Sequence, residues 1–230
     1  MAVKNTTKKK KASETVLLPA ILDVLNKTYP DHPMGKLTEG RPFRVLVACI
    51  MSLRTRDDMM IPLAEKLFKE ADTPEAILKF SEAEFAQKIY PVGFYKTKAK
   101  NILKICELLI NNYNSHVPDD IDTLLTFPGV GRKTANLVVG LGHKLPAVCV
   151  DIHVHRICHR LGYLKTKDPE ETEMFIRENL PQAYWHIINR VLVRHGQDCC
   201  KPINPNCQAC PVLNLCKQVD VKTKPSSLKK

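Results

Sequence analysis

The segment from Phe127 to Ala135 reads Phe-Pro-Gly-Val-Gly-Arg-Lys-Thr-Ala and places Arg132 and Lys133 directly after a glycine turn. Gly129 and Gly131 can adopt positive φ without a Cβ clash, and the first backbone N–H groups of the helix that we predict from Arg132 have no intrahelical acceptor. Such a turn can hold a phosphate. The helix start and Arg132 also disfavour the charged form of Lys133, and this is how a lysine becomes nucleophilic near neutral pH. Taken alone, an αα-hairpin with a surface lysine explains the segment equally well.

Asp151 is the second candidate for chemistry, eighteen residues after Lys133 and just before a predicted helix. N-capping fully explains an aspartate in this place. The pairing with Lys133 adds a catalytic interpretation, since a lysine nucleophile needs a carboxylate to move protons and to stabilise cationic intermediates. His153 and His155 match no zinc-peptidase or deaminase arrangement, so we interpret them as polar helix positions or as donors to DNA phosphates.

Four cysteines near the C-terminal end have the spacing C-x6-C-x2-C-x5-C, and they are Cys200, Cys207, Cys210 and Cys216. Thiols this close together in a reducing compartment predict a metal site. The spacing alone does not choose between zinc and an iron–sulfur cluster, because both accept four cysteines, and structural zinc is the default. Cys199 adjoins the first ligand and is either a bystander or its substitute.

The amino-acid composition limits the classes of protein to which the chain can belong. The 230 residues are 44% hydrophobic, which is enough for a sizeable core in one domain or two small ones. We expect no signal peptide and no membrane span, and nine cysteines without a secretion signal argue against a disulfide scaffold. The expected location is therefore cytosolic (nucleoid-associated in a bacterium) or nuclear, not secreted.

The net charge of +11 is concentrated at the two ends of the chain. Residues 1–15 and 217–230 each carry five lysines and one acidic residue, so +3 remains for residues 16–216. We expect disordered tails, including Lys8 to Lys11, that attract any polyanion without reading sequence. A solubilising or localising role explains them equally well, so the body of the chain has to identify the partner.

Helical periodicity runs through nearly the whole chain. Apolar side chains recur at i, i+3, i+4 and i+7 from Phe43 to Ile50, and Ile102, Cys106 and Leu109 repeat the pattern. Helix starts are marked at Thr73-Pro74-Glu75 and Asp168-Pro169-Glu170 and by a capping box of Ser81 with Glu84. Only Ala147 to Val150 is β-like. We therefore predict an all-α protein of about ten helices.

The ordered set of hairpin, Asp151-Ile152-His153-Val154-His155-Arg156 and cysteine loop resembles the endonuclease III family, over roughly residues 14–218. Two further segments fit this family: Ser52 to Asp57 looks like its first DNA-facing loop, and Gly93 to Ala99 like its second. The resemblance implies base-excision repair of double-stranded DNA with damaged bases or abasic sites, by a protein that we expect to be a monomer.

The resemblance also implies the domain organisation and the cofactor. A helical barrel over 36–146 would contain the helix-hairpin-helix, and a second domain of 14–35 plus 147–218 would hold a [4Fe-4S] cluster, which overrides the zinc default. A DNA cleft would lie between the domains, and residues 1–13 and 219–230 would be the tails.

The family's chemistry implies that Lys133 attacks C1′ of an extruded nucleotide and forms a Schiff base, with Asp151 assisting. The DNA-contact residues would be Arg54, Phe94, Tyr95, Gly129, Gly131, Arg132 and His153. Arg54 departs from the family, which usually has glutamine there, so the opposite-base preference is open. Phe94 is an apolar wedge or, alternatively, a core side chain.

The sequence is compatible with three functions. The first is a bifunctional glycosylase and lyase acting on oxidised pyrimidines. The second is a monofunctional mismatch or alkylated-base glycosylase, which Lys133 disfavours, because family members of that kind lack this lysine. The third is a non-enzymatic DNA-binding module that uses the hairpin and tails and carries the metal for structure.

Overall fold

Every regular element in residues 17–30 and 33–222, which this computed structural model describes, is helical, so the expected all-α class is confirmed. This part of the chain contains twelve α-helices, more than expected because several are only one turn long. The β-like segment from Ala147 to Val150 forms no strand. A strand needs a paired neighbour for its backbone groups, and the described chain offers no second extended strand. Its four side chains are nevertheless buried.

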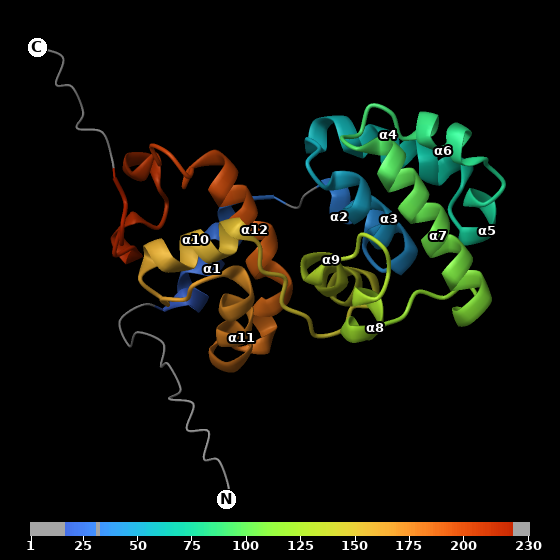
Figure 1. Cartoon of the computed structure of the whole chain (residues 1–230). Helices are drawn as coiled ribbons and strands as arrows, with labels where there is room; N and C mark the ends of the chain where they lie inside the picture. Colours follow the sequence, from blue (N-terminus) through green and yellow to red (C-terminus); the bar gives the residue numbers. More distant parts are fainter. Residues whose placement is uncertain (1–16, 31–32, 223–230) are drawn as a thin grey trace, which may run out of the picture. The chain divides into compact units, whose positions relative to one another are not determined.

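Two units make up the chain (Figure 1). We call the described residues 33–149 the central unit, and 17–30 with 150–222 the terminal unit. The boundaries follow Pro30 and Cys149, a few residues from the limits expected from the sequence. An N-terminal helix therefore packs with elements that follow it by more than a hundred residues, and the terminal unit is discontinuous in sequence.

The central unit is organised around α3 (Pro42–Ser52), whose apolar face is buried by Leu46, Val47 and Ile50 as the periodicity predicts. This helix packs against α2 (Pro33–Thr38), α4 (Asp57–Glu70), α7 (Tyr95–Tyr113), α9 (Arg132–Leu137) and the π-helical segment η1 (Val138–Gly142). The remaining helices are α5 (Pro74–Ile77), α6 (Glu82–Lys88) and α8 (Ile121–Leu125). The packing positions the ends of α3, α7 and α9, where the site residues of this unit lie.

Side-chain caps start several helices at the positions that the sequence predicts. Thr73 accepts a hydrogen bond from the Ala76 N–H at 3.2 Å at the start of α5, and Ser81 and Glu84 form the capping box of α6. Asp168 accepts from the Glu171 N–H at 2.8 Å and caps α11. These helix starts are confirmed, because each cap satisfies a backbone donor that the helix itself leaves unpaired.

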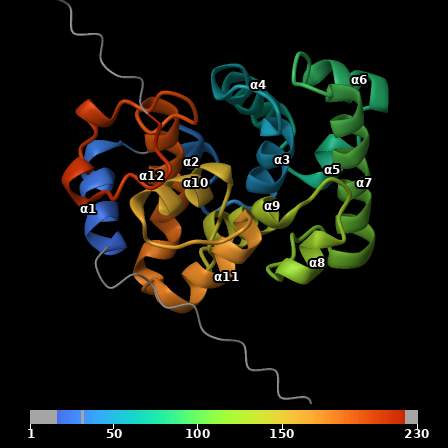
Figure 2. The ribbon, with the colours of Figure 1, turned by 60° about the vertical axis from the view of Figure 1, so that its left-hand side comes forward.

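The terminal unit packs α12 (Trp185–Asp198) against α1 (Leu18–Thr28) and α10 (Ile152–Leu161), and α10 against α11 (Pro169–Asn179). Figure 2 shows α12 leading into the irregular C-terminal segment, drawn in red. Three short 3-10 turns complete the unit, and they are η2 (Gln182–Tyr184), η3 (Cys207–Ala209) and η4 (Leu213–Leu215). The four cysteines of the predicted metal site lie in the loop that follows α12, where η3 and η4 are the only regular structure in the described residues.

Val219 and Asp220 contact α10, although the sequence analysis assigns residues 219–230 to a disordered tail. The Val219 N–H donates to the Arg160 carbonyl at 2.9 Å, and His159 Nε2 lies 2.9 Å from an Asp220 carboxylate oxygen. The run from Lys8 to Lys11, and the rest of both predicted tails, lie outside the described residues. None of the described helices is long and apolar enough to cross a membrane.

Candidate functional site

The glycine hairpin connects α8 to α9 in the central unit. Gly129 has a φ of +77°, where a Cβ is strained, and an added Cβ would also lie 2.6 Å from Asn101 Nδ2. Gly131, the N-cap of α9, has a φ of −102°, and no heavy atom lies within 4 Å of the Cβ position. Positive φ is therefore realised at Gly129 only, and the backbone at Gly131 is extended and open to any residue.

Lys133 is exposed in the first turn of α9, and the helix begins there without a side-chain cap at Gly131. The opposite face of the turn is buried through Thr134 and Ala135. Cys49 from α3 is a neighbour of Lys133, and burial raises the pKa of this thiol to about 12 against the opposing effect of the lysine charge. The thiol of Cys49 beside the lysine is therefore neutral at pH 7.

Asp151 is the N-cap of α10 in the terminal unit. Its Oδ1 accepts from the backbone N–H groups of His153 at 2.9 Å and Val154 at 3.1 Å, so the capping interpretation is confirmed. Both bonds end on the same carboxylate oxygen. A capping role does not exclude chemistry, because the carboxylate of a cap lies at the solvent-facing end of its helix.

His153 and Tyr95 are packing residues in this structure. The Nδ1 of His153 lies 3.1 Å from an Arg156 guanidinium nitrogen, and a Cβ on Gly196 of α12 would lie 2.3 Å from the same Nδ1. The rings of Tyr95 and Tyr90 meet edge to face at 5.3 Å. These contacts fit the polar packing position for His153 and hold the ring of Tyr95 in place, and the DNA-contact roles of both residues stay predictions.

Arg54 and Phe94 lie side by side in the central unit, on the two segments that the sequence analysis identifies as DNA-facing. The Arg54 guanidinium carbon is 5.6 Å from the centre of the Phe94 ring. Phe94 is 63% exposed, which rules out the core-packing alternative. Both residues have left-handed backbone conformations, with φ of 53° and 58°. Lys98, which the sequence analysis missed, is buried beneath them.

The cysteine loop encloses a cavity in the terminal unit. Cys200, Cys207, Cys210 and Cys216 all line it, as predicted, and so do Cys199 and His195. The loop begins where α12 ends, and the N–H groups of Cys199 and Cys200 both donate to the His195 carbonyl, at 2.9 and 2.8 Å. One chain segment therefore brings five thiols and an imidazole to the same cavity.

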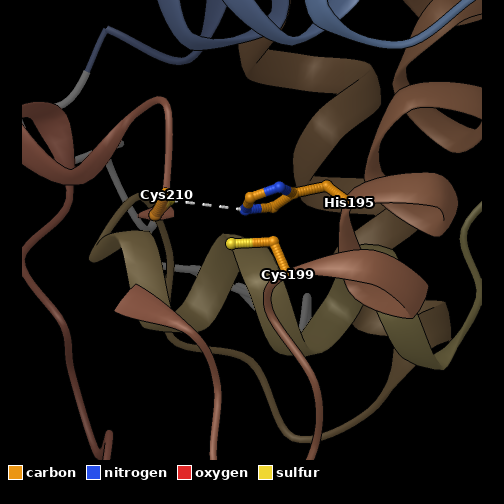
Figure 3. Close-up of side chains that lie close together, drawn as sticks. All are labelled: His195, Cys199 and Cys210. Carbon is orange, nitrogen blue, oxygen red and sulfur yellow. Dashed lines mark hydrogen bonds between the residues drawn. The ribbon is translucent and has the colours of Figure 1, made fainter. Parts of the chain in front are cut away.

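His195, Cys199 and Cys210 form a tighter group within this cavity, with their ligand atoms within 4.8 Å of one another (Figure 3). Nε2 of His195 lies 3.7 Å from the Cys210 sulfur, and its Nδ1 lies 3.0 Å from the Tyr29 hydroxyl. Burial lowers the pKa of His195 to about 4. The sequence analysis did not consider His195, although a histidine five residues before the first ligand cysteine is a visible signal.

The donor set fits a metal or a metal cluster. Besides the thiols, N–H groups point at sulfur: Arg160 donates to Cys200 Sγ at 3.4 Å and the Gln218 N–H to Cys216 Sγ at 3.4 Å. Such donors stabilise thiolates, the form in which cysteine binds metals. Two donor sets share the cavity, namely the four predicted cysteines and the group of His195, Cys199 and Cys210.

Comparison with known proteins assigns the chain to a superfamily and to a family within it. Residues 47–182 match the model of the HhH-GPD superfamily of base excision DNA repair proteins, a range that contains the glycine hairpin and Asp151. Endonuclease III of Thermotoga maritima is 44% identical over 179 residues, covering 78% of this chain and 84% of that protein. The chain belongs to the endonuclease III family.

Two solved structures extend the comparison. A non-covalent endonuclease III–DNA complex is similar with a TM-score of 0.78 and 36% identity, covering 87% of this chain and 94% of that chain. A trapped endonuclease III–DNA covalent intermediate, an estranged-adenine complex, has the same TM-score, identity and coverage. The likeness extends over both units of the described chain.

The two hairpin glycines predict different effects on stability. Gly129→Ala should lower the free energy of unfolding by about 1 to 2 kcal/mol, because a Cβ is strained at positive φ. Gly131→Ser is the control, because it also adds a Cβ while serine is a favourable N-cap, and its effect should stay within about 0.5 kcal/mol. Urea denaturation of both variants measures this difference. Equal stabilities would mean that the backbone at Gly129 is not left-handed in solution.

Proposed function

We propose that this protein is a bifunctional DNA glycosylase and lyase of base-excision repair, which removes oxidised pyrimidines and cleaves the resulting abasic site through a Schiff base. The observation that carries the proposal is Lys133, an exposed amine in the first turn of α9 directly after the glycine hairpin. Membership of a family in which a covalent DNA intermediate has been trapped supports it. The partner would be double-stranded DNA with damaged bases or abasic sites, bound by a monomer.

A base inside a duplex is out of reach of any amine on a protein surface. The damaged nucleotide must rotate out of the stack, at a cost of a few kcal/mol that is lowest for lesions that already stack or pair badly. Arg54 and Phe94 would occupy the space that the nucleotide leaves, since both are exposed and adjacent. The hairpin, with Gly131 and Arg132, would bind the neighbouring phosphates.

The reaction proceeds in two bond-breaking stages. The neutral Nζ of Lys133 attacks C1′, the bond from C1′ to the base breaks, and the base leaves with a proton. Opening of the sugar ring gives the Schiff base between Nζ and C1′. Loss of a C2′ proton then expels the 3′ phosphate by β-elimination, which cleaves the strand 3′ to the lesion. Water finally hydrolyses the Schiff base and releases Lys133.

Asp151 would accept the proton that Lys133 loses and stabilise positive charge on the sugar. Lys133 lies in the central unit and Asp151 in the terminal unit. The order of the motifs along the chain and the family membership support their joint role. Because Oδ1 is held by two backbone N–H groups, the carboxylate keeps a fixed orientation during proton transfer.

Cys200, Cys207, Cys210 and Cys216 would hold a [4Fe-4S] cluster, and the cavity that they line supports this assignment. When bound, the cluster cross-links the loop after α12 and stabilises this part of the fold. Arg160 and the Gln218 N–H then donate to ligand sulfurs. A protein that acts on DNA would be located in the cytoplasm or nucleoid of a bacterium or archaeon, or in a nucleus.

Lys133→Gln should abolish the covalent product that borohydride traps with an abasic duplex. Glutamine has no nucleophilic amine, whereas DNA affinity should stay within about tenfold, since one charge among several phosphate contacts is lost. Gel electrophoresis of the trapped product and a binding titration at fixed salt measure the two effects. Trapping by the variant would assign the nucleophile to another amine, and a wild type that never traps would favour the monofunctional or non-enzymatic alternatives.

Asp151→Asn should leave the helix intact and slow the reaction. Asparagine provides the same cap oxygen and caps about as well as aspartate, so the melting temperature should change little. Single-turnover excision should fall by about two orders of magnitude or more, because the proton acceptor is lost. Asp168→Asn, at the cap of α11, is the matched control for the cap chemistry. An Asp151→Asn protein with full activity would leave Asp151 a purely structural cap.

The metal assignment is tested by Cys199→Ala and Cys207→Ala, because each belongs to only one of the two donor sets. With a cluster on the four predicted cysteines, Cys207→Ala should lose iron and labile sulfide, and Cys199→Ala should retain both. Metal analysis and the visible absorbance of the purified proteins measure this. A colourless protein with one zinc, which Cys199→Ala loses and Cys207→Ala keeps, would assign the site to His195, Cys199 and Cys210.

A further inference from the structure

Lys98 is a buried lysine on the apolar face of α7. Lys98 is only 6% exposed, and it lies on the same side of the helix as the buried residues Ala99 and Ile102. Burial of an ammonium is unfavourable unless each of its N–H groups finds an acceptor. An exposed lysine can be explained by its contribution to solubility, but a buried one cannot. The position of Lys98 therefore needs another explanation.

The Nζ of Lys98 has an acceptor for each of its three donors. It donates to the carbonyl of Met51 at 2.9 Å, to the carbonyl of Leu53, and to the Thr55 hydroxyl at 3.3 Å. These acceptors lie at the C-terminal end of α3 and in the segment that follows it. The last carbonyls of a helix lack intrahelical donors and carry its negative dipole end, so Lys98 caps α3 from a different helix.

The same segment is also fixed to the residues just before α7. Thr55 Oγ1 accepts a hydrogen bond from the Gly93 N–H at 3.1 Å. A Cβ on Gly93 would lie 2.9 Å from the Arg54 carbonyl oxygen, so the two backbones touch at a distance that only glycine allows. We call residues 53–55 and 92–94 together the paired loops.

The paired loops hold two exposed side chains in an unfavourable backbone conformation. Arg54 and Phe94 both have positive φ, which is uncommon for residues with a Cβ and persists only where surrounding contacts impose it. The contacts that impose it here come from Lys98, Thr55 and Gly93. Without them, both segments could relax, and the distance of 5.6 Å between the Arg54 guanidinium and the Phe94 ring would not be maintained.

We propose that Lys98 is a positioning residue, whose buried ammonium sets the conformation of the paired loops and so presents Arg54 and Phe94 together to the space that an extruded nucleotide leaves. The last clause rests on the proposed function, and the effect on the loops does not. Burial lowers the pKa of Lys98 to about 8, so the ammonium predominates at pH 7. Because Lys98 is buried and its donors are used, it is not a second nucleophile.

Hydrogen–deuterium exchange of the free protein tests the structural half. Lys98→Met keeps the length of the side chain and removes the donors, so amides in 52–56 and 92–96 should exchange about tenfold faster. Exchange in the hairpin, 127–133, should stay unchanged. Lys104→Met, which removes an exposed lysine from the same helix, is the control.

Measurements of catalysis test the part of the proposal that concerns function. A single-stranded abasic oligonucleotide needs no wedge, so Lys98→Met should be trapped on it as fast as the wild type. Excision of a lesion from a duplex should fall about tenfold, and the differences in rate between the four opposite bases should shrink. Lys104→Met should keep the wild-type ratio of the two substrates. If the wild type is trapped on neither substrate, the proposed function fails, and the exchange experiment still decides the effect on the loops.

Thr55 provides a second pair of variants if Lys98→Met does not fold. Thr55→Ser keeps the bridging hydroxyl and Thr55→Val removes it, so only valine should accelerate exchange at Gly93 and lower duplex excision. Unchanged exchange and an unchanged substrate ratio in a folded Lys98→Met protein would overturn the proposal. If that protein does not fold, identical behaviour of the serine and valine variants would overturn it.

Discussion

The residues to which the proposed function assigns roles lie where helices begin or end, and the backbone groups exposed there must find partners. A helix leaves its first N–H groups and its last carbonyls without intrahelical bonds, and leaving such groups unpaired in a folded protein is costly. In this protein Arg54 follows α3, Phe94 precedes α7, Lys133 lies in the first turn of α9 and Asp151 caps α10. The positions of these four residues therefore depend on which groups pair with the free backbone N–H and carbonyl groups at each helix end.

The unpaired backbone groups find a different kind of partner at each of these helix ends, and the partner fits the role proposed for the residues there. The start of α10 is closed by its own carboxylate, which holds Asp151 in one orientation. The start of α9 has no side-chain cap, and this suits a backbone that approaches a phosphate. The end of α3 takes its donors from Lys98 of another helix, which ties the loop after α3 to the loop before α7.

The cysteine loop of the terminal unit has a different source of stability from the helices of that unit, which bury apolar side chains. The loop after α12 contains only short 3-10 turns, so its backbone contributes little cooperative structure of its own. Five cysteines and His195 line the cavity that it encloses, and Arg160 donates to the carbonyls of Lys201 at 2.6 Å and Pro202 at 2.8 Å. A metal cross-link and a buried arginine are alternatives to a hydrophobic core for a segment with so few apolar side chains.

The sequence by itself determined what depends on local spacing. Helix periodicity, the caps at Thr73, Ser81 and Asp168, and the cysteine spacing are readable because their partners lie within a few residues. The order of the motifs along the chain likewise indicates the family. The conformation of Gly131 and the absence of a strand at 147–150 do not follow from such local patterns. His195 and Cys199 stand next to the predicted ligands in the sequence, but only the structure shows that both line the same cavity.

Tertiary structure alone decided the hydrogen-bond partners of Lys98 and the pairing of Arg54 with Phe94. The stripe of Ile102, Cys106 and Leu109 extends back by one turn to Lys98, so the sequence shows a lysine at a core position. It does not show which acceptors the lysine meets, because Met51 and Leu53 lie more than forty residues away along the chain. Local patterns specify a helix and its ends, whereas the partner of a buried charge is specified only when distant segments pack together.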